Sequence, residues 1–451
     1  MSITRGLPGH FQTNPKRQRG TIPRWMSRLP CSRCGLLLVV VAVVLTVSAA
    51  PISAQTDAKG EWPQFLGPQR NGLSSETGLL DRWPDDGPQE LWRVPGGVGM
   101  SGLAISRGRV LTLVQREGKQ WLIALDAKTG DSIWQTPLAP EYRNAMGNGP
   151  RGTPAISGDQ VFVFTGEGIL SAHGFADGKQ LWSHHVVKEL SGKEAEYGMA
   201  CSPLVVGEQV IVTAGSAKGT LVAFDTKSGK QLWTAGKDPA GYSSPALLNV
   251  GGRQQVVAFT GSSALGVDPA KGTLLWRYPF KTNFECNITT PLEIKEDVFL
   301  SAGEDHGSVL LGLKPKADSF EISEVWSSFG NKSVLRNEWQ TSMLLDGYLY
   351  GLDNAGGAGP ITHLTCIDAA TGERKWQQAR FGKGNLIAAD GKLFLTTMKG
   401  ELVLVRATPE RYDELGRATV LGSTRQAPAL SNGRLFLRDD KEIVCLNVRK
   451  P

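Results

Sequence analysis

The stretch Leu122-Ile-Ala-Leu-Asp126-Ala-Lys-Thr-Gly130-Asp-Ser-Ile-Trp134 contains the pattern on which the fold of this chain depends. The alternating residues that end in Asp126 predict a β-strand, because successive side chains of a strand point to opposite faces. The Asp126 side chain can accept backbone N–H groups of the following turn, and Gly130 supplies the positive φ that closes this turn. A second strand then begins next to Trp134.

The same line recurs along the chain. Close copies are Asp225…Gly229…Trp233, Asp268…Gly272…Trp276 and Asp368…Gly372…Trp376, and a weaker one runs through Leu170…Gly178…Trp182. With Trp92 and Trp326 added, the spacings between successive Trp residues are 42, 48, 51, 43, 50 and 50. A period of this size indicates a repeat architecture, in which each repeat buries its apolar face against its neighbours.

Each repeat also contains a second hairpin upstream of the Asp-Gly turn. It opens with a small residue and Pro, continues through a Gly or Asp turn, and ends in an apolar strand; Thr153-Pro154…Gly158…Val161-Phe-Val-Phe164 is an example. Two hairpins give four antiparallel strands, which is the blade of a β-propeller.

The numbers of predicted strands give the number of blades. Third strands are expected at 122–126, 170–174, 221–225, 264–268, 309–313, 364–368, 402–406 and 443–447. First strands are expected to begin near Gly102, Thr153, Ser202, Ser244, Thr290, Thr341, Asn385 and Ala427. The sequence therefore predicts an all-β fold, an eight-bladed β-propeller with four-stranded antiparallel blades.

The last predicted third strand, Ile443–Asn447, is followed by no Trp strand, whereas Glu90-Leu-Trp92-Arg-Val94 precedes the first full repeat. We therefore expect the N-terminal strand to complete the C-terminal blade, since closing the ring removes exposed sheet edges. The repeated Trp side chains should fill the space between neighbouring blades, with each indole N–H on a backbone acceptor. These structural Trp residues are Trp92, Trp134, Trp182, Trp233, Trp276, Trp326 and Trp376.

Residues 1–54 have the features of a secretory signal peptide, with Met26 as a possible true start. They hold seven basic residues and no acidic one, and the apolar run 36–47 is followed by small residues up to Ala54. The alternative is an uncleaved inner-membrane anchor, because 35–54 carries no charge. We expect an exported protein, periplasmic or extracellular, with residues 55–89 as an extension packed on a propeller of residues 90–451.

Without the leader the chain has 42 basic and 43 acidic residues. This balance offers no basic surface for nucleic acid, and no integral membrane domain is expected after signal removal. Cys366 and Cys445 occupy equivalent repeat positions and should be small core residues. Whether Cys201 and Cys286 pair is left open by the sequence.

The repeated motif resembles the pyrrolo-quinoline-quinone-like (PQQ-like) repeat over residues 91–451. That repeat occurs in quinone-dependent alcohol dehydrogenases and in the propeller of the outer-membrane β-barrel assembly machinery. The dehydrogenase resemblance implies a quinone over the funnel, a calcium ion held by Glu, Asn or Asp, and commonly a disulfide between adjacent cysteines. This chain has no Cys-Cys pair. The assembly-factor resemblance implies a lipid-anchored leader, whereas Cys31 and Cys34 precede the apolar run.

The loops that enter the innermost strands are polar and should converge at one face of the ring. Arg and Asn side chains with Tyr and Trp on one rim suit an anionic or sugar-like ligand, or an acidic peptide; the competing interpretation is that they are ordinary solvated loop residues. The ligand-binding candidates are Asn148, Arg151, Tyr197, Tyr242, Asn287, Arg336, Glu338, Trp339, Lys383 and Arg425. We expect the four cations among them to face one mouth of the channel and to make it positive.

The leading functional hypothesis is a monomeric, non-catalytic exported propeller that binds an envelope protein or a small ligand at the central funnel. Under this hypothesis we expect no catalytic residue, no metal and no cofactor. The alternative is a PQQ-dependent dehydrogenase of the cell envelope, which would hold the quinone together with calcium. No Ser/His/Asp arrangement, phosphate-binding loop or zinc pattern is evident in the sequence.

Overall fold

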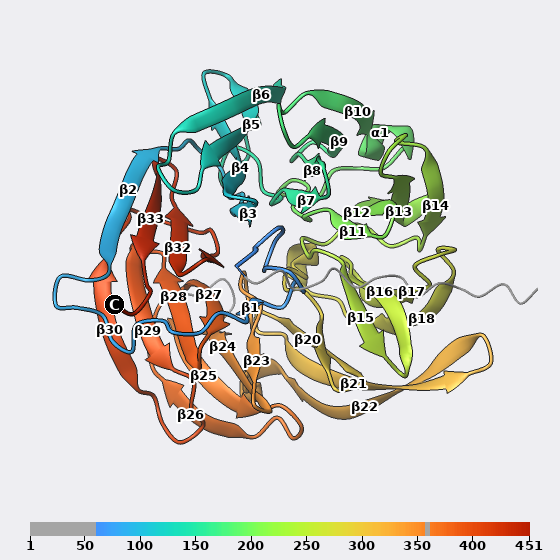
Figure 1. Cartoon of the computed structure of the whole chain (residues 1–451). Helices are drawn as coiled ribbons and strands as arrows, with labels where there is room; N and C mark the ends of the chain where they lie inside the picture. Colours follow the sequence, from blue (N-terminus) through green and yellow to red (C-terminus); the bar gives the residue numbers. More distant parts are fainter. Residues whose placement is uncertain (1–59, 357–360) are drawn as a thin grey trace, which may run out of the picture. The chain divides into compact units, whose positions relative to one another are not determined.

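The strands of this chain, seen in a computed structural model that describes residues 60–356 and 361–451, form eight sheets arranged as the blades of a propeller (Figure 1). The predicted leader, residues 1–54, lies outside the described residues. The first four blades are β3 (Ala104–Ser106), β4 (Arg109–Arg116), β5 (Lys119–Asp126) and β6 (Ser132–Pro140); β7 (Ala155–Ser157), β8 (Gln160–Phe164), β9 (Ile169–Gly174) and β10 (Gln180–His185); β11 (Leu204–Val206), β12 (Gln209–Ser216), β13 (Gly219–Asp225) and β14 (Gln231–Ala235); β15 (Ala246–Val250), β16 (Arg253–Phe259), β17 (Ser263–Val267) and β18 (Leu274–Pro279).

The other four blades follow the same order. They are β19 (Leu292–Ile294), β20 (Asp297–Ala302), β21 (Gly307–Lys316) and β22 (Ser319–Phe329); β23 (Met343–Leu345), β24 (Tyr348–Ala355), β25 (Ile361–Asp368) and β26 (Arg374–Gln378); β27 (Gly384–Ala389), β28 (Lys392–Thr397), β29 (Glu401–Arg406) and β30 (Glu414–Thr419); β31 (Ala429–Ser431), β32 (Arg434–Arg438), β33 (Glu442–Asn447) and β2 (Gln89–Pro95). Short pieces complete the list: β1 (Leu73–Ser74), α1 (Val186–Glu189), η1 (Asn283–Glu285) and η2 (Gly330–Lys332).

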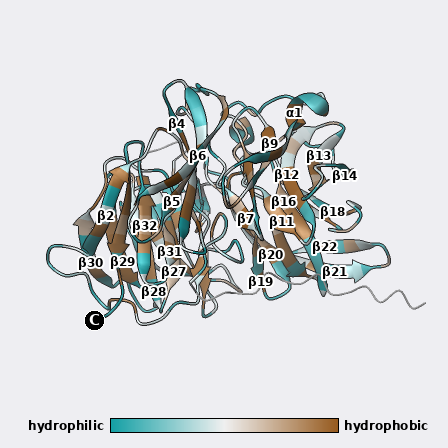
Figure 2. Ribbon diagram, turned by 45° about the horizontal axis from the view of Figure 1, so that its top comes forward, coloured by the Kyte–Doolittle hydropathy of each residue, from teal (hydrophilic) through white to brown (hydrophobic). Residues whose placement is uncertain are grey.

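The predicted architecture is confirmed, including the closure of the ring. β2 pairs antiparallel with β33, with Trp92 opposite Cys445, so the N-terminal strand supplies the fourth strand of the last blade. The innermost strands β3 and β31 of the first and last blades are in contact. The buried apolar side chains lie between the sheets, and Figure 2 shows these strands in brown inside the blades.

The Asp-Gly turns form as the sequence predicts. The Asp126 carboxylate accepts hydrogen bonds from the backbone N–H groups of Lys128 and Thr129, at 2.7 and 3.0 Å. Gly130 has a φ of +81°, and a Cβ there would lie 2.9 Å from the Trp92 ring of the preceding blade. The repeated Gly is therefore needed twice, for the turn and for the close approach of the neighbouring Trp.

Each of the seven repeated Trp side chains lies on a fourth strand. Five of them donate the indole N–H to a backbone carbonyl of the next blade, for instance Trp326 to Ala369 at 3.0 Å. Trp233 and Trp276 differ from this expectation, because they donate to the side chains of Gln209 and Gln255 within their own blades.

The seventh blade has Gly416 at the position that Trp takes in the others. The ring of Trp83, from the N-terminal segment 60–88, occupies the space above it: a Cβ on Gly416 would lie 2.6 Å from Trp83. Trp83 is 4% exposed and packs against Phe394 with a centroid distance of 5.9 Å. Trp83 thus fills the inter-blade position that the Trp of the repeat fills in the other blades.

We expect Trp83→Ala to lower the free energy of unfolding by about 3–5 kcal/mol, because truncation of a buried Trp leaves a large cavity. Denaturant titration measures the change. Trp121→Ala, at a half-exposed Trp, is the matched control and should cost clearly less. Equal losses at the two positions would show that Trp83 does not fill an inter-blade position.

The N-terminal segment also closes the channel from one side. Because each blade is an antiparallel meander, the turns between first and second strands share one face, here called the far face. Leu79 N–H donates to the Asp390 carboxylate, and Gly433 N–H to that of Glu76; both partners outside the segment lie in far-face turns. Figure 1 shows this segment, in blue, crossing the centre of the ring.

Candidate functional site

A cavity of about 370 Å³ lies at the centre of the opposite face, here called the funnel face. This face carries the connections between blades and the turns between second and third strands. Ligand pockets usually have volumes of about 300–1,000 Å³, so the cavity suits a small group or a side chain. All eight blades contribute to its lining: Phe65, Met100, Gly102, Met146, Arg151, Thr153, Tyr197, Ala200, Ser202, Tyr242, Ser244, Phe284, Cys286, Ile288, Glu304, Glu338, Trp339, Lys383, Asn385, Arg425 and Ala427.

Hydroxyl groups at the start of the innermost strands join neighbouring blades around this cavity. The Thr153 hydroxyl accepts from Gly102 N–H at 3.0 Å, and the Ser202 hydroxyl accepts from Thr153 N–H at 2.9 Å. Ser244 and Thr341 play the same part for Ser202 and Thr290. Each of these four hydroxyl residues opens a repeat in the sequence and joins its innermost strand to that of the preceding blade.

Seven of the ten sequence candidates line the cavity. They are Arg151, Tyr197, Tyr242, Glu338, Trp339, Lys383 and Arg425. Their convergence follows from ring geometry, because each stands shortly before an innermost strand. Their role in ligand binding stays a prediction.

The three cations in the cavity wall already have partners within the protein. Arg151 is 7% exposed and donates to the backbone carbonyls of Tyr197, Gly147 and Gly149. Burial lowers the pKa of Arg151. Arg151 therefore holds two funnel loops together.

Lys383 and Arg425 meet at one aromatic ring. The Lys383 ammonium lies 4.9 Å from the Trp339 ring centroid, and the Arg425 guanidinium carbon lies 5.3 Å from it. Lys383 also forms an ion pair with Glu338 at 2.8 Å. Burial nevertheless raises the pKa of Glu338 above its usual value, with the Lys383 hydrogen bond acting against it. Because Glu338 balances Lys383, the mouth is less positive than the sequence led us to expect.

On the opposite wall, Tyr197 and Tyr242 stack with a centroid distance of 5.6 Å. The Tyr242 hydroxyl accepts from Tyr197 N–H at 3.3 Å. Cys286 lies beside them as a free thiol, and Cys201 is also free. Burial, with smaller contributions from nearby carboxylates, raises the pKa of Cys286 to about 12, so this thiol stays protonated at neutral pH.

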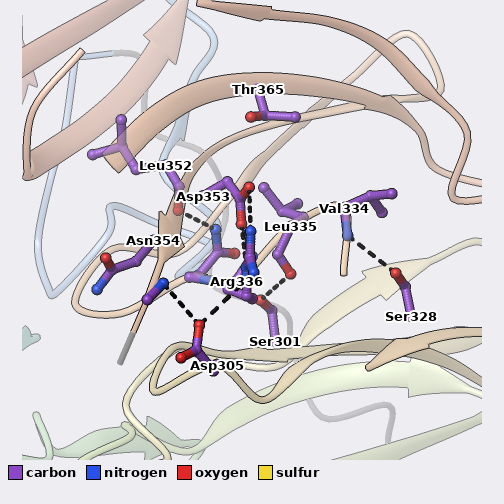
Figure 3. A network of polar contacts seen from close by, with 12 residues as sticks. Ser301, Asp305, Ser328, Val334, Leu335, Arg336, Leu352, Asp353, Asn354 and Thr365 are labelled. Carbon is purple, nitrogen blue, oxygen red and sulfur yellow. Dashed lines mark hydrogen bonds and ion pairs between the residues drawn. The ribbon is translucent and has the colours of Figure 1, made fainter. Parts of the chain in front are cut away.

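Arg336 does not face the mouth with the other cations. Its guanidinium pairs with Asp353 of β24 at 2.8 and 3.0 Å, inside the network drawn in Figure 3. The side chain is 8% exposed and that of Asp353 is 1% exposed. The expectation of four convergent cations is therefore wrong for Arg336, because its guanidinium forms an ion pair with Asp353 instead of facing the mouth.

Two further candidates also have structural positions. Asn287 is fully buried, and its amide donates to the carbonyls of Thr260 and Phe280. The Asn148 side chain accepts from Asn144 N–H at 3.1 Å within its own loop. Neither residue lines the cavity, because both side chains are used to shape the loops around it.

Several cavity residues were missed by sequence reasoning. Phe65 forms part of the lining although it comes from the N-terminal segment, and Arg70 of the same segment donates to the carbonyls of Ser202 and Pro203. Phe284 and Met146 line the cavity while remaining 60% and 39% exposed. Phe65 stands in the run Trp62-Pro-Gln-Phe65, which has no feature that predicts a position inside the ring.

Within residues 60–356 and 361–451, no group of three or more His, Cys, Asp or Glu side chains could hold a metal ion. None of the helices in that part of the chain has the length and apolar character of a membrane span.

The family model described as outer membrane protein assembly factor BamB matches residues 84–189, 118–310 and 361–449. BamB of Yersinia pestis is 22% identical over 327 residues, which cover 70% of this chain and 66% of that protein. Quinohemoprotein alcohol dehydrogenase ADH IIB of Pseudomonas putida is 31% identical over 240 residues, covering 48% of this chain and 33% of that protein. The chain thus spans less than two thirds of either curated relative.

Solved structures show the same fold. The quinohemoprotein alcohol dehydrogenase from Comamonas testosteroni superposes with a TM-score of 0.63 at 13% identity, covering 87% of this chain and 81% of that chain. The computationally designed Ika8 protein gives 0.53 at 13% identity, covering 80% and 100%. At this identity the likeness concerns the fold alone.

Proposed function

The chain belongs to the PQQ-like repeat family whose model is described as outer membrane protein assembly factor BamB, and on this premise we propose that it is an exported, non-catalytic scaffold that binds a protein partner or a small ligand at its central funnel. The observation that carries the proposal is the cavity of about 370 Å³, which gathers side chains from every blade. An assembly role on the envelope side of a membrane agrees with the relatives named as assembly factors.

The polar side chains of the cavity wall are held in place by the protein itself, which supports the proposal. Arg151 is held by three carbonyls, Lys383 by Glu338, and Arg425 by the Met146 carbonyl at 2.6 Å. Side chains that are already fixed lose little conformational entropy on binding. Phe284 and Met146 offer apolar surface at the rim, which is typical of a recognition site.

The residues present do not fit a calcium-bound quinone. Of the two carboxylates that line the cavity, Glu338 already accepts from Lys383 and from the Asn354 amide. Calcium takes six to eight oxygen ligands, and the described chain has no group of three or more His, Cys, Asp or Glu side chains placed to hold a metal ion. A PQQ-dependent oxidoreductase remains the second candidate, because the chain is also similar to a quinohemoprotein alcohol dehydrogenase.

Reconstitution separates the two candidates. We expect purified protein incubated with PQQ and Ca²⁺ to show no dye-linked oxidation of alcohols above that of buffer with cofactor. A PQQ-dependent dehydrogenase assayed in parallel supplies the positive control. Robust turnover that requires both PQQ and Ca²⁺ would overturn the scaffold proposal.

Site-specific photo-crosslinking tests the binding itself. A crosslinker in place of Phe284 should trap a discrete partner or ligand from an envelope extract, since this residue lines the cavity and is exposed. The control position is Leu232, which is 46% exposed on the outer strand β14. Identical products from both positions would argue against a funnel site.

A further inference from the structure

The charged side chains around the funnel are divided between two sides of its rim. Glu196, Glu285 and Glu304 lie on the side of the third to fifth blades, before β11, before β19 and in the β20–β21 turn. Among the described residues, no ion pair neutralises any of the three. Together with Glu338 they lie near enough to Cys286 to act on its thiol. Four carboxylates therefore gather on this side of the rim.

Three cations lie on the other side of the rim. Arg380 and Lys399 are exposed on the connection before β27 and in the β28–β29 turn, and Arg425 precedes β31. In the part of the chain that the structure describes, none of these three cations forms an ion pair. The Lys383–Glu338 pair separates the two halves. The funnel therefore has these carboxylates on one side of its mouth and these cations on the other, rather than charges of one sign.

The cavity continues toward the basic side. A second hollow of about 550 Å³ is lined by Arg380, Phe381 and Lys399, and it shares Trp339 and Lys383 with the central cavity. Its one acidic residue, Glu401, is paired with Arg417 at 3.2 Å. A ligand that enters the central cavity could thus extend over Trp339 into a basic hollow.

Apolar surface lies next to both charged sides, since Phe284 precedes Glu285 and the Met146 carbonyl accepts from Arg425. Phe284 and Met146 are exposed at the rim, and Phe65 lines the cavity below them. An apolar pocket with a charged rim is suited to bury one large anchor side chain of a binding partner. Opposite charges on the two sides would fix the direction in which that partner lies.

Building on the proposed binding function, we infer that the ligand is an extended polypeptide segment with opposite charges at its two ends. A large apolar side chain in its middle enters the central cavity. Its basic end lies over Glu196, Glu285 and Glu304, and its acidic end lies over Trp339 in the hollow of Arg380 and Lys399. A small anion or a uniformly acidic peptide would meet the unpaired carboxylates and is therefore disfavoured.

Fluorescence anisotropy with labelled peptides of about 12 residues, which reach about 40 Å when extended, tests this inference. The bipolar peptide carries a Lys block, a central Leu-Phe pair and an Asp block. A permuted peptide has the same composition with alternating Lys and Asp, and a third peptide is uniformly acidic. We expect the bipolar peptide to bind about tenfold more tightly than either control, an effect within reach of three exposed ion pairs.

Charge variants at the rim should change this preference. Glu196→Lys with Glu285→Lys and Glu304→Lys makes the rim basic, so the preference should pass to the uniformly acidic peptide. Arg380→Glu with Lys399→Glu should weaken the bipolar peptide about tenfold. Asp85→Lys, Asp86→Lys and Asp318→Lys, at exposed positions away from the funnel, form the matched control and should change nothing. Thermal melting shows that each variant is folded.

The outcomes separate this inference from the function on which it rests. Equal affinity for the bipolar and permuted peptides, tighter binding of the acidic one, or no peptide binding at all overturns the inference. The proposed funnel function survives those results if the crosslink from Phe284 is still formed. It fails if that crosslink is absent and Phe284→Ser changes the binding of no peptide.

Discussion

Deletion of residues 88–95 should leave a protein that aggregates or melts far below the full chain. The deletion removes β2, six of whose seven residues pair along β33 and complete the last blade. It also removes Trp92, which is 8% exposed and donates to the Ala127 carbonyl of the first blade. Truncation of a buried Trp alone costs about 3–5 kcal/mol. Loss of the whole strand should therefore approach the total stability of many domains, about 5–15 kcal/mol.

Soluble yield and thermal melting measure this effect. Replacement of the same eight positions by a Gly-Ser segment keeps the tether to the N-terminal segment and should be almost as damaging, because the edge of β33 stays open. A rescue variant carries the Gly-Ser segment and, after Asn447, a copy of the Ala127–Gly130 turn followed by residues 89–95. Recovery of stability there would attribute the loss to the missing strand. A deletion variant that melts like the full chain would show that β2 does not close the ring.

The blades could be predicted from the sequence because their signals are local and repeated. Strand alternation, the Asp-Gly turn and the following Trp all fall within 13 residues of one another, as in Leu122–Trp134. Ring closure was also predictable, since Trp92 at one end matched the strand missing at the other. Trp83 was not, because its partner Gly416 is a position where the repeated signal is absent.

The candidate site could be predicted only in part. Arg151, Lys383 and Arg425 converge because they share a place in the repeat, and that place can be read from the sequence. Whether a cation is free depends on its neighbours in space. Asp353 lies 17 positions after Arg336, and no motif joins them. Glu304 belongs to a turn between second and third strands, whereas the sequence candidates were all taken from the loops that enter the innermost strands. That turn adds Glu304 to the carboxylates of the entering loops, Glu196 and Glu285.

The second large effect concerns the buried pair Arg336–Asp353 (Figure 3). Asp353 accepts from the backbone N–H of Arg336 at 2.9 Å as well as from its guanidinium, and the guanidinium hydrogen bonds raise the pKa of Arg336 against the effect of burial. The Arg336 guanidinium also lies 3.9 Å from Asp305 of the fifth blade, so the pair helps to join two blades. Removal of one partner would leave a buried charge without its counterion.

We expect Asp353→Ala to lower the free energy of unfolding by about 3–5 kcal/mol, the usual cost of breaking a buried ion pair. Chemical denaturation measures the loss. Replacing both partners by apolar residues, Arg336→Met with Asp353→Leu, should recover most of it, because no unpaired charge remains. Glu208→Ala, which breaks the fully exposed pair with Lys227, is the matched control and should have no measurable effect. A loss for Asp353→Ala as small as that for Glu208→Ala would contradict this interpretation. It would show that the Arg336 guanidinium reaches solvent, as the cations of the funnel rim do.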